Sequence, residues 1–531
     1  MKNPGKYFVG VSCFILVNIG VVSAQYQYPF QDPTLPDEER IDNLISLITL
    51  EEKVNALATQ FGIPRLGIRN CGHVEGLHGL AYGGPSNWGS RSPVPSTIFP
   101  QAYGLGETWD VDLVKKVAEQ ESYENRYYYQ SPKYFRGSLV MRAPNADLGR
   151  DPRWGRTEEC FGEDAWLNSR MVVAFVKGLQ GDDRNYWRTA SLMKHFMANS
   201  NEDGRDSTSS NFDERLFREY YGYPFYKGIT EGGARAFMAS YNAYNGVPMT
   251  VHPVLKDVTV KEWGNNGIIC TDGGALTLLF NAHKYFPTMA EAAAACVKAG
   301  IGQFLDNYKP SVKEALKKGL LNEEEIDQVI RGNFRVALRL GLLDAKQDNP
   351  YSKIGVQDTI DPWTKSEVKT FVREVTAKSI VLLKNSDKLL PLDAQRIKSI
   401  AVIGPRANEV LLDWYSGTPP YRVTPLQGII DACGKNIKVT YVAENSMDLA
   451  VNAASAADVA IVIVGNHPIG TTPDWKVSPV PSDGKEAVDR KSLTLEQEDL
   501  VKLVYKANPK TIMVLVSSFP FAINWSEENI P

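Results

Sequence analysis

Several segments of the chain share one pattern, a short apolar run that ends in polar residues. The pattern occurs at residues 137–156, 189–205, 234–246 and 267–274, and more weakly at 299–307. Between these segments, apolar residues recur at three- and four-residue spacing, which predicts helices over 213–232, 310–321 and 322–343. Strands that alternate with helices indicate parallel βα units, arranged either as a β/α barrel or as a doubly wound sheet. In both folds the polar strand ends meet at one edge, so the pattern predicts a shared pocket.

A second group of buried strands follows a polar stretch with little periodicity. We interpret residues 345–364 as a linker between a first βα domain, 25–344, and a second α/β domain, 365–531. A helix over about 365–384 is expected to open the second domain, and strands are predicted at 399–405, 437–443, 457–465 and 510–518. Few elements follow the last strand, so we expect this domain to be incomplete and the chain to be C-terminally truncated.

The first 24 residues are typical of a secretory signal peptide. Lys2 and Lys6 precede an apolar run to about Val22, and the small residues Ser23 and Ala24 offer a cleavage site before Gln25. An uncleaved membrane anchor is the alternative, although the apolar run is short for a membrane span. We therefore expect a secreted or periplasmic protein with no stable membrane insertion after cleavage.

Composition argues against several classes of function. The formal net charge is −4, and without a basic stripe nothing favours nucleic acid as a partner. No cysteines lie in CxxC spacing and the histidines form no HExxH motif, so a metal site is not expected. The chain also lacks a convincing phosphate-binding glycine loop and a GxSxG serine elbow. Neither a metal nor an organic cofactor is predicted, and the oligomeric state is left open.

The polar strand ends combine carboxylates with basic and aromatic side chains, a composition suited to sugars. Charged side chains form hydrogen bonds with sugar hydroxyls, and aromatic rings cover the apolar face of the sugar. Glycoside hydrolysis needs two carboxyl groups, which lie roughly 5–5.5 Å apart in retaining enzymes, where one of them attacks directly. Asp272 suits the attacking group because a strand end holds it and the two following glycines leave room for substrate.

An ordered set of motifs resembles glycoside hydrolase family 3, the exo-acting β-glucosidases and β-xylosidases. The motifs are VEGLHGL (74–80), STIFPQAYGLGETWD (96–110), RDPRWGRTEECFGED (150–164), KHF (194–196), MASYNAYNGVP (238–248) and GIICTDGG (267–274). The resemblance covers nearly the whole chain after residue 24. It implies a (β/α)8-type, TIM-like barrel that binds an oligosaccharide or glycoside substrate, followed by an α/β sandwich domain.

Carried over residue by residue, the resemblance implies that Asp272 is the catalytic nucleophile. The expected sugar-binding residues are Glu75, Arg156, Lys194, His195 and Arg205, with Tyr241 near the nucleophile. The acid/base is expected in the second domain, at Glu486 within PSDGKEAVDRKSLTLEQ (481–497), with Asp483 as the alternative. We expect Lys194 and the arginines to keep Asp272 ionised, and we expect burial and the Asp272 charge to raise the pKa of Glu486.

Two departures from the family pattern bear on specificity. Gly273 stands where the family often has a sizeable residue beside the leaving group, and Glu75 replaces the aspartate of many β-glucosidases, which favours a pentose such as xylose. Trp154 is left open between a core residue and a sugar platform, and His78 is interpreted as structural.

The sequence thus predicts a retaining exo-β-glycosidase that acts on terminal β-D-glucosyl or β-D-xylosyl residues. One alternative is a β-N-acetylglucosaminidase or phosphorylase of the same family, whose single-domain forms carry the acid/base as a histidine on a barrel loop. Another is a non-catalytic carbohydrate-binding remnant, left without turnover by truncation.

Overall fold

The computed structural model describes residues 1, 26–82, 93–344, 348–358, 360–386, 388–443, 447–472, 474, 475 and 477–531. Apart from Met1, the proposed signal peptide, 1–24, lies outside these residues. Among the described residues, no helix combines the length and apolar character needed to cross a membrane. The domain limits at 344 and 364 stay predictions.

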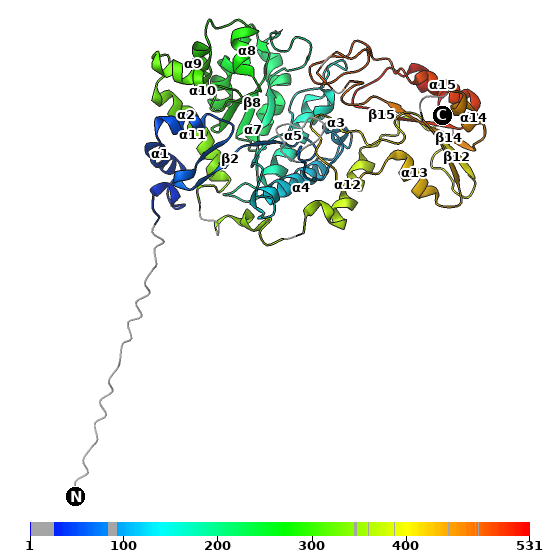
Figure 1. Ribbon diagram of the computed structural model, residues 1–531, viewed down its shortest axis with the longest axis horizontal. Helices are drawn as coiled ribbons and strands as arrows, with labels where there is room; N and C mark the ends of the chain where they lie inside the picture. Colours follow the sequence, from blue (N-terminus) through cyan, green and yellow to red (C-terminus); the bar gives the residue numbers. More distant parts are fainter. Residues whose placement is uncertain are drawn as a thin grey trace.

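The first part of the chain is a TIM-like barrel with helices packed around its short strands, which pair in parallel except for two short antiparallel pairs (Figure 1). Its strands are β1 (Phe61–Ile63), β2 (Ile68–Cys71), β3 (His73–Glu75), β4 (Val140–Arg142), β5 (Ala190–Ser191), β6 (Met193–Phe196), β7 (Ser209–Ser210), β8 (Ala236–Ala239), β9 (Ala243–Tyr244), β10 (Val247–Pro248) and β11 (Ile268–Thr271). Parallel pairing joins β3, β4 and β5 in one sheet and β6, β8 and β11 in another. Each of the four predicted segments therefore contains a barrel strand. The weaker fifth contributes isolated bridges, through Gln303 and Phe304.

The helices of the barrel domain follow the predicted periodicity. They are α1 (Asp37–Leu47), α2 (Leu50–Ala56), α3 (Ala102–Gly106), α4 (Val111–Gln130), α5 (Ala165–Gln180), α6 (Glu214–Leu216), α7 (Tyr223–Thr230), α8 (Ala275–Asn281), α9 (Met289–Ala299), α10 (Lys309–Lys317) and α11 (Glu323–Arg339). Local chemistry fixes several of their starts. Asn322, for example, accepts a hydrogen bond from the backbone N–H of Glu325, whose side chain accepts the Asn322 N–H in return.

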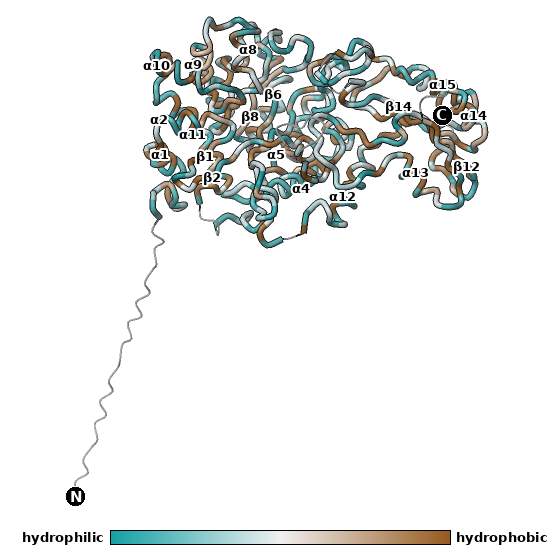
Figure 2. Tube along the Cα trace, viewed as in Figure 1, coloured by the Kyte–Doolittle hydropathy of each residue, from teal (hydrophilic) through white to brown (hydrophobic). Residues whose placement is uncertain are grey.

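The second domain is built on one parallel sheet with the strand order β13-β12-β14-β15. Its elements are α12 (Ser366–Lys378), β12 (Ser399–Ile403), α13 (Pro425–Cys433), β13 (Lys438–Val442), α14 (Met447–Ser455), β14 (Val459–Gly465), α15 (Glu498–Ala507), β15 (Thr511–Val516) and α16 (Asn524–Asn529). The four predicted strands are all present. The central strand β14 is buried along its whole length, because apolar cores cover both faces of the sheet. Figure 2 shows these hydrophobic stretches running through both domains.

The helix predicted over 365–384 is shorter than expected. It ends at Lys378, and the exposed residues Ile380, Val381, Leu382 and Leu383 that follow belong to no helix or strand. Four apolar residues in a row lack the 3.6-residue period of an amphipathic helix, and two of them are β-branched, which disfavours a continued helix.

Buried contacts join the two domains. Trp363, Trp414, Tyr415 and Ile469 belong to the same apolar core as the barrel. His78 lies 2.9 Å from the Asp413 carboxylate, and both side chains are almost fully buried. His78 is therefore an interdomain contact, consistent with the structural interpretation, and not a residue facing an open pocket.

Helix α11 packs against the start of β11 at a point with no room for a side chain. A Cβ on Gly332 would lie 2.1 Å from the carbonyl oxygen of Gly267. Because backbone atoms on both sides cannot move aside cheaply, α11 and the strand that precedes Asp272 are held in close contact.

We predict that Gly332→Ala lowers the free energy of unfolding by at least about 1–3 kcal/mol, the usual cost of overpacking a core. The matched control is Gly428→Ala on the exposed side of α13, where an added Cβ meets nothing within 4 Å. That control is expected to be neutral or stabilising by up to about 1 kcal/mol. Urea unfolding of the two variants checks the prediction, and equal stability of both would contradict it.

Candidate active site

The predicted site residues meet at the carboxyl ends of the barrel strands. β3 ends at Glu75, β6 carries Lys194 and His195, and β11 ends one residue before Asp272. This is the edge at which parallel βα folds place their chemistry, because every strand arrives there with the same direction. The structure thus brings these polar strand ends together, as their pattern predicts.

Asp272 is buried, and only one of its two carboxylate oxygens accepts a hydrogen bond among the described residues. Its Oδ1 accepts the backbone N–H of Gly273 at 2.7 Å, whereas Oδ2 has no hydrogen-bond partner among the described residues. His195 Nε2 lies 3.7 Å from Oδ2. Burial raises the pKa of Asp272, and the charges of Arg156 and Arg205 only partly oppose this effect. The arginines therefore favour the ionised form of Asp272, as expected, but burial has the larger effect and the net shift of the pKa is upward.

Glu75 lies between two cations. Arg142 Nη1 donates to Oε1 at 2.8 Å, and Lys194 Nζ donates to Oε2 at 3.0 Å. Burial opposes ionisation of Glu75, but the charges of Lys194 and Arg142 outweigh it and lower the pKa. Glu75 is thus a carboxylate held in place at the strand ends, and Lys194 forms an ion pair with it.

Arg156 is the buried centre of the site. Its Nε and Nη2 donate to the Glu159 carboxylate at 2.6 and 2.9 Å, and Nη2 lies 3.2 Å from His195 Nε2. Its Nη1 has no hydrogen-bond partner among the described residues and lies 3.8 Å from Glu486 Oε1. His195 is oriented by Asp147, which accepts from both its backbone N–H and Nδ1, at 3.1 and 2.9 Å.

Glu486 reaches this centre from the second domain. Its Oε1 accepts from Arg205 Nη1 at 3.1 Å and its Oε2 accepts the Tyr415 hydroxyl at 2.8 Å. Burial would raise the pKa of Glu486, but Arg156, Arg205 and the Tyr415 hydrogen bond together hold it below its ordinary value. The pKa of Glu486 was expected to be raised. That expectation is wrong, because attraction to the nearest cations outweighs the effect of burial.

Tyr241 and Asp483 differ in their relation to the site. The Tyr241 hydroxyl donates to the Gly273 carbonyl at 2.9 Å, and the Arg205 guanidinium lies 4.8 Å from the centre of its ring. Tyr241 is therefore beside Asp272, as expected. The described hydrogen bonds of Asp483 are with Thr471 and Ser478 of its own domain. These contacts do not bring Asp483 to the barrel, so the structure favours Glu486 over this alternative.

Five residues of the site were not identified from the sequence. They are Arg142, Asp147, Glu159, Glu202 and Tyr415. The first four lie within the polar segments 137–156, 150–164 and 189–205, but the pattern does not say which polar side chains turn towards the site. Tyr415 lies between β12 and α13, in a stretch with no periodic signal.

Glu202 has both oxygens occupied inside the protein. Trp154 Nε1 donates to Oε1 at 2.9 Å, while Arg205 Nη1 and the Ala487 N–H donate to Oε2 at 2.6 and 2.9 Å. Burial raises the pKa of Glu202 to about 7, against the opposing charges of Arg205 and Arg156. Trp154 is 1% exposed, so it is a core residue here and not an open sugar platform.

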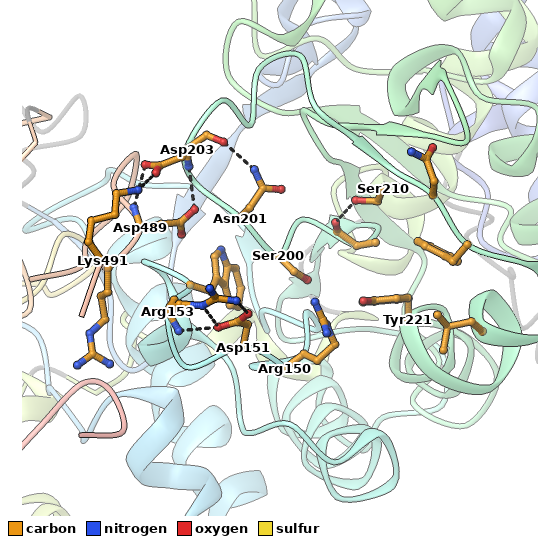
Figure 3. A pocket seen from close by; sticks show the side chains of 16 residues that line it. Arg150, Asp151, Arg153, Ser200, Asn201, Asp203, Ser210, Tyr221, Asp489 and Lys491 are labelled. Atoms are coloured by element: carbon orange, nitrogen blue, oxygen red, sulfur yellow. Dashed lines mark hydrogen bonds and ion pairs between the residues drawn. The ribbon is translucent and has the colours of Figure 1, made fainter. Parts of the chain in front are cut away.

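A polar cavity of about 640 Å³ adjoins these residues on the outer side (Figure 3). It is lined by Arg150, Arg153, Trp154, Asp203, Asp489 and Lys491, among others. None of the eight predicted site residues lines it. The convergence of charged groups therefore places the candidate site at the strand ends, beside this cavity. No group of three or more His, Cys, Asp or Glu side chains in the described residues is arranged to hold a metal ion.

We predict that Asp272→Asn raises thermal stability at pH 7. A pKa raised by folding means that the folded protein holds this proton more tightly than the unfolded chain, so ionisation of Asp272 costs stability at high pH. The gain should be about 1.4 kcal/mol for each unit by which folding raises the pKa, and should vanish below the unfolded value of about 3.9. Melting curves of both proteins from pH 4 to pH 8 check this, and a less stable variant at pH 7 contradicts it.

Two family models match the chain. The glycosyl hydrolase family 3 N-terminal domain matches residues 48–336, and the family 3 C-terminal domain matches residues 380–531. Both domains of the family are represented, so the expectation of a truncated chain is not supported by these matches. Together the two models cover most of the chain, including all eight predicted site residues.

Individual relatives agree with this assignment. The chain is 33% identical over 93% of its length to a beta-xylosidase of Formosa agariphila and 30% identical over 94% of its length to beta-D-xylosidase 3 of Arabidopsis thaliana, and it spans 68% and 65% of the length of these relatives. The solved structure of a GH3 exo-beta-xylosidase (XlnD) in complex with a xylobiose aziridine probe superposes with a TM-score of 0.82 at 26% identity, covering 94% of this chain and 64% of that one. The chain belongs to glycoside hydrolase family 3.

Proposed function

We propose that this chain is a retaining exo-β-glycosidase that releases terminal β-D-xylosyl or β-D-glucosyl residues from oligosaccharides or glycosides. The observation that carries the proposal is a pair of buried groups without hydrogen-bond partners among the described residues. They are Asp272 Oδ2, 3.7 Å from His195 Nε2, and Arg156 Nη1, whose guanidinium also contacts His195 through Nη2. Buried polar groups without partners are costly unless a ligand satisfies them. A sugar with its anomeric carbon at Asp272 supplies hydroxyl groups for such donors and acceptors.

The reaction follows from two carboxyl groups in different environments. Asp272 attacks the anomeric carbon while protonated Glu486 gives its proton to the departing oxygen, which leaves a glycosyl ester on Asp272. Glu486, now a carboxylate, takes a proton from water as that water attacks the ester, and the sugar leaves with its original configuration. The charge of Arg156 acts on both carboxyls, which supports a shared reaction centre.

The remaining predicted residues bind the sugar. Glu75, held ionised by Arg142 and Lys194, accepts hydrogen bonds from hydroxyls, and Arg156, Lys194, His195 and Arg205 donate to or orient them. Glu75 extends one methylene further than an aspartate, which narrows the space for a C5 substituent and favours xylose. The beta-xylosidase names of the relatives support the same preference.

Gly273 leaves the leaving-group side of the site open. A Cβ at this position would meet Leu305 and the Tyr241 hydroxyl only at ordinary contact distance, 3.6 Å. We infer that the missing side chain at Gly273, the departure noted in the sequence, widens the range of leaving groups.

We further propose that the protein acts outside the cytoplasm, a proposal that rests on the N-terminal leader pattern alone.

The two alternatives are less well supported. In the same-family alternative a histidine on a barrel loop acts as acid/base, whereas here the second domain delivers Glu486 and Tyr415 to the site. A non-catalytic remnant would not need a second carboxyl group in the site, so the presence of Glu486 there argues against this alternative. Sugar binding without hydrolysis by the folded protein would favour that remnant.

The nucleophile is tested with aryl β-xyloside and aryl β-glucoside as substrates. Asp272→Ala is expected to lose activity on the order of 10⁴-fold or more, as for loss of a covalent nucleophile, while keeping its fold. Azide should rescue Asp272→Gly and yield a glycosyl azide of inverted configuration, because the small anion replaces the missing carboxylate. If Asp272→Ala keeps full activity, the proposed mechanism is wrong.

Activity should be greatest at acidic pH, and its pH dependence should reflect the ionisation of Asp272 and Glu486. Folding raises the pKa of Asp272 and lowers that of Glu486, so both shifts disfavour the productive state, ionised Asp272 with protonated Glu486, in the free enzyme. For a disaccharide, kcat/KM should form a bell, because activity needs one carboxyl ionised and the other protonated. The falling alkaline side reports Glu486 and should be absent in Glu486→Gln assayed with an activated aryl glycoside. An unchanged alkaline side in that variant would assign it to another group.

A further inference from the structure

The loop that carries Glu486 makes a tight turn against the barrel. Lys485 and Val488 form an antiparallel bridge, and Ala487 between them has φ +70°. Gly155 of the barrel lies directly beneath, where a Cβ would come within 2.1 Å of the Val488 carbonyl oxygen. The carbonyls on this side of the turn thus pack against the barrel, and Glu486 is held at the domain boundary.

Glu202 holds this turn from the barrel side. Its Oε2 accepts the N–H of Ala487, the residue next to Glu486, and also accepts from Arg205 Nη1. The same Arg205 nitrogen donates to Glu486 Oε1. Glu202 therefore fixes both the backbone adjoining Glu486 and the cation that contacts its carboxylate.

Asp489 makes the reciprocal contact from the second domain. Its Oδ2 accepts the backbone N–H groups of Glu202 and Asp203 at 2.8 and 2.9 Å, and its Oδ1 accepts that of Gly155 at 3.0 Å. Figure 3 shows the Asp489 carboxylate facing Asp203 at the edge of the cavity. Carboxylates of each domain thus accept hydrogen bonds from backbone N–H groups of the other.

We propose that Glu202 and Asp489 are positioning residues that set the Glu486 carboxyl against the leaving oxygen, an inference that rests on the proposed function. Neither side chain needs to contact substrate. Glu202 is completely buried with both oxygens occupied, so it acts through Ala487 and Arg205 and not as a proton donor itself. The barrel, more than the second domain alone, determines where the acid/base sits.

The test compares Glu202→Gln and Asp489→Asn with wild type on two glycosides of one sugar. One has a highly acidic phenol that leaves without a proton, and the other is a disaccharide that needs one. A misplaced acid should lower kcat/KM about 10²-fold for the disaccharide and only a few-fold for the activated aryl glycoside. Lys491→Gln is the matched control, since it removes an exposed interdomain ion pair between the same loop and Asp203. It should change kcat/KM only slightly, and to the same extent for both substrates.

Equal losses with both substrates, or no loss, would overturn the proposal. If one variant fails to fold, the other tests the opposite half of the same contact. Hydrogen exchange gives a readout independent of activity: exchange in residues 483–491 should accelerate in both variants but not in Lys491→Gln, while that of β11 stays unchanged. If the wild type hydrolyses neither substrate but exchange accelerates in both variants, the proposed function is refuted and the loop contact is supported. If exchange in the variants is unchanged, the contact itself is refuted.

Discussion

The arrangement of this site depends on Arg156, a guanidinium buried among more carboxyl groups than it can neutralise. The buried acids at the strand ends are Glu75, Asp147, Glu159, Glu202, Asp272 and Glu486, and the cations are Arg142, Arg156, Lys194 and Arg205. Burying a charge is costly unless it is paired, so six acids beside four cations cannot all be ionised cheaply.

For four of these carboxyls, the direction of the pKa shift follows from how many cations lie nearby. Glu159 differs, because burial raises its pKa although Arg156 and Lys194 both lie within 4.0 Å. Glu75 and Glu486 each lie near two cations, and their pKa values are lowered. Glu202 contacts Arg205 alone, and Asp272 has no cation at hydrogen-bond distance, so burial raises the pKa of both. The sequence could not reveal this division, because it depends on distances between residues that lie far apart along the chain.

Sequence reasoning succeeded where one physical rule acts over a whole segment. Parallel βα units bring the polar residues after each strand to one edge, so the order of strands and polar ends along the chain is enough to group Asp272, Lys194 and His195. Glu75 was assigned through the family resemblance. Sequence reasoning failed where single contacts decide. Tyr415 and Glu202 reach the site through the docking of two domains, and the end of α12 at Lys378 depends on a run of apolar residues whose period is lost.

The same electrostatics suits both steps of the proposed reaction. Before attack, Asp272 carries the negative charge and Glu486 the proton. After attack, Asp272 is a neutral ester and Glu486 is the carboxylate. Arg156 interacts with both groups, so it faces one negative charge from the pair in either state. A site built to hold a single charge between two carboxyls need not reorganise as that charge moves from the barrel to the second domain, which is the condition for effective electrostatic stabilisation. The contacts that fix Glu486 to the barrel keep this exchange within reach of one guanidinium.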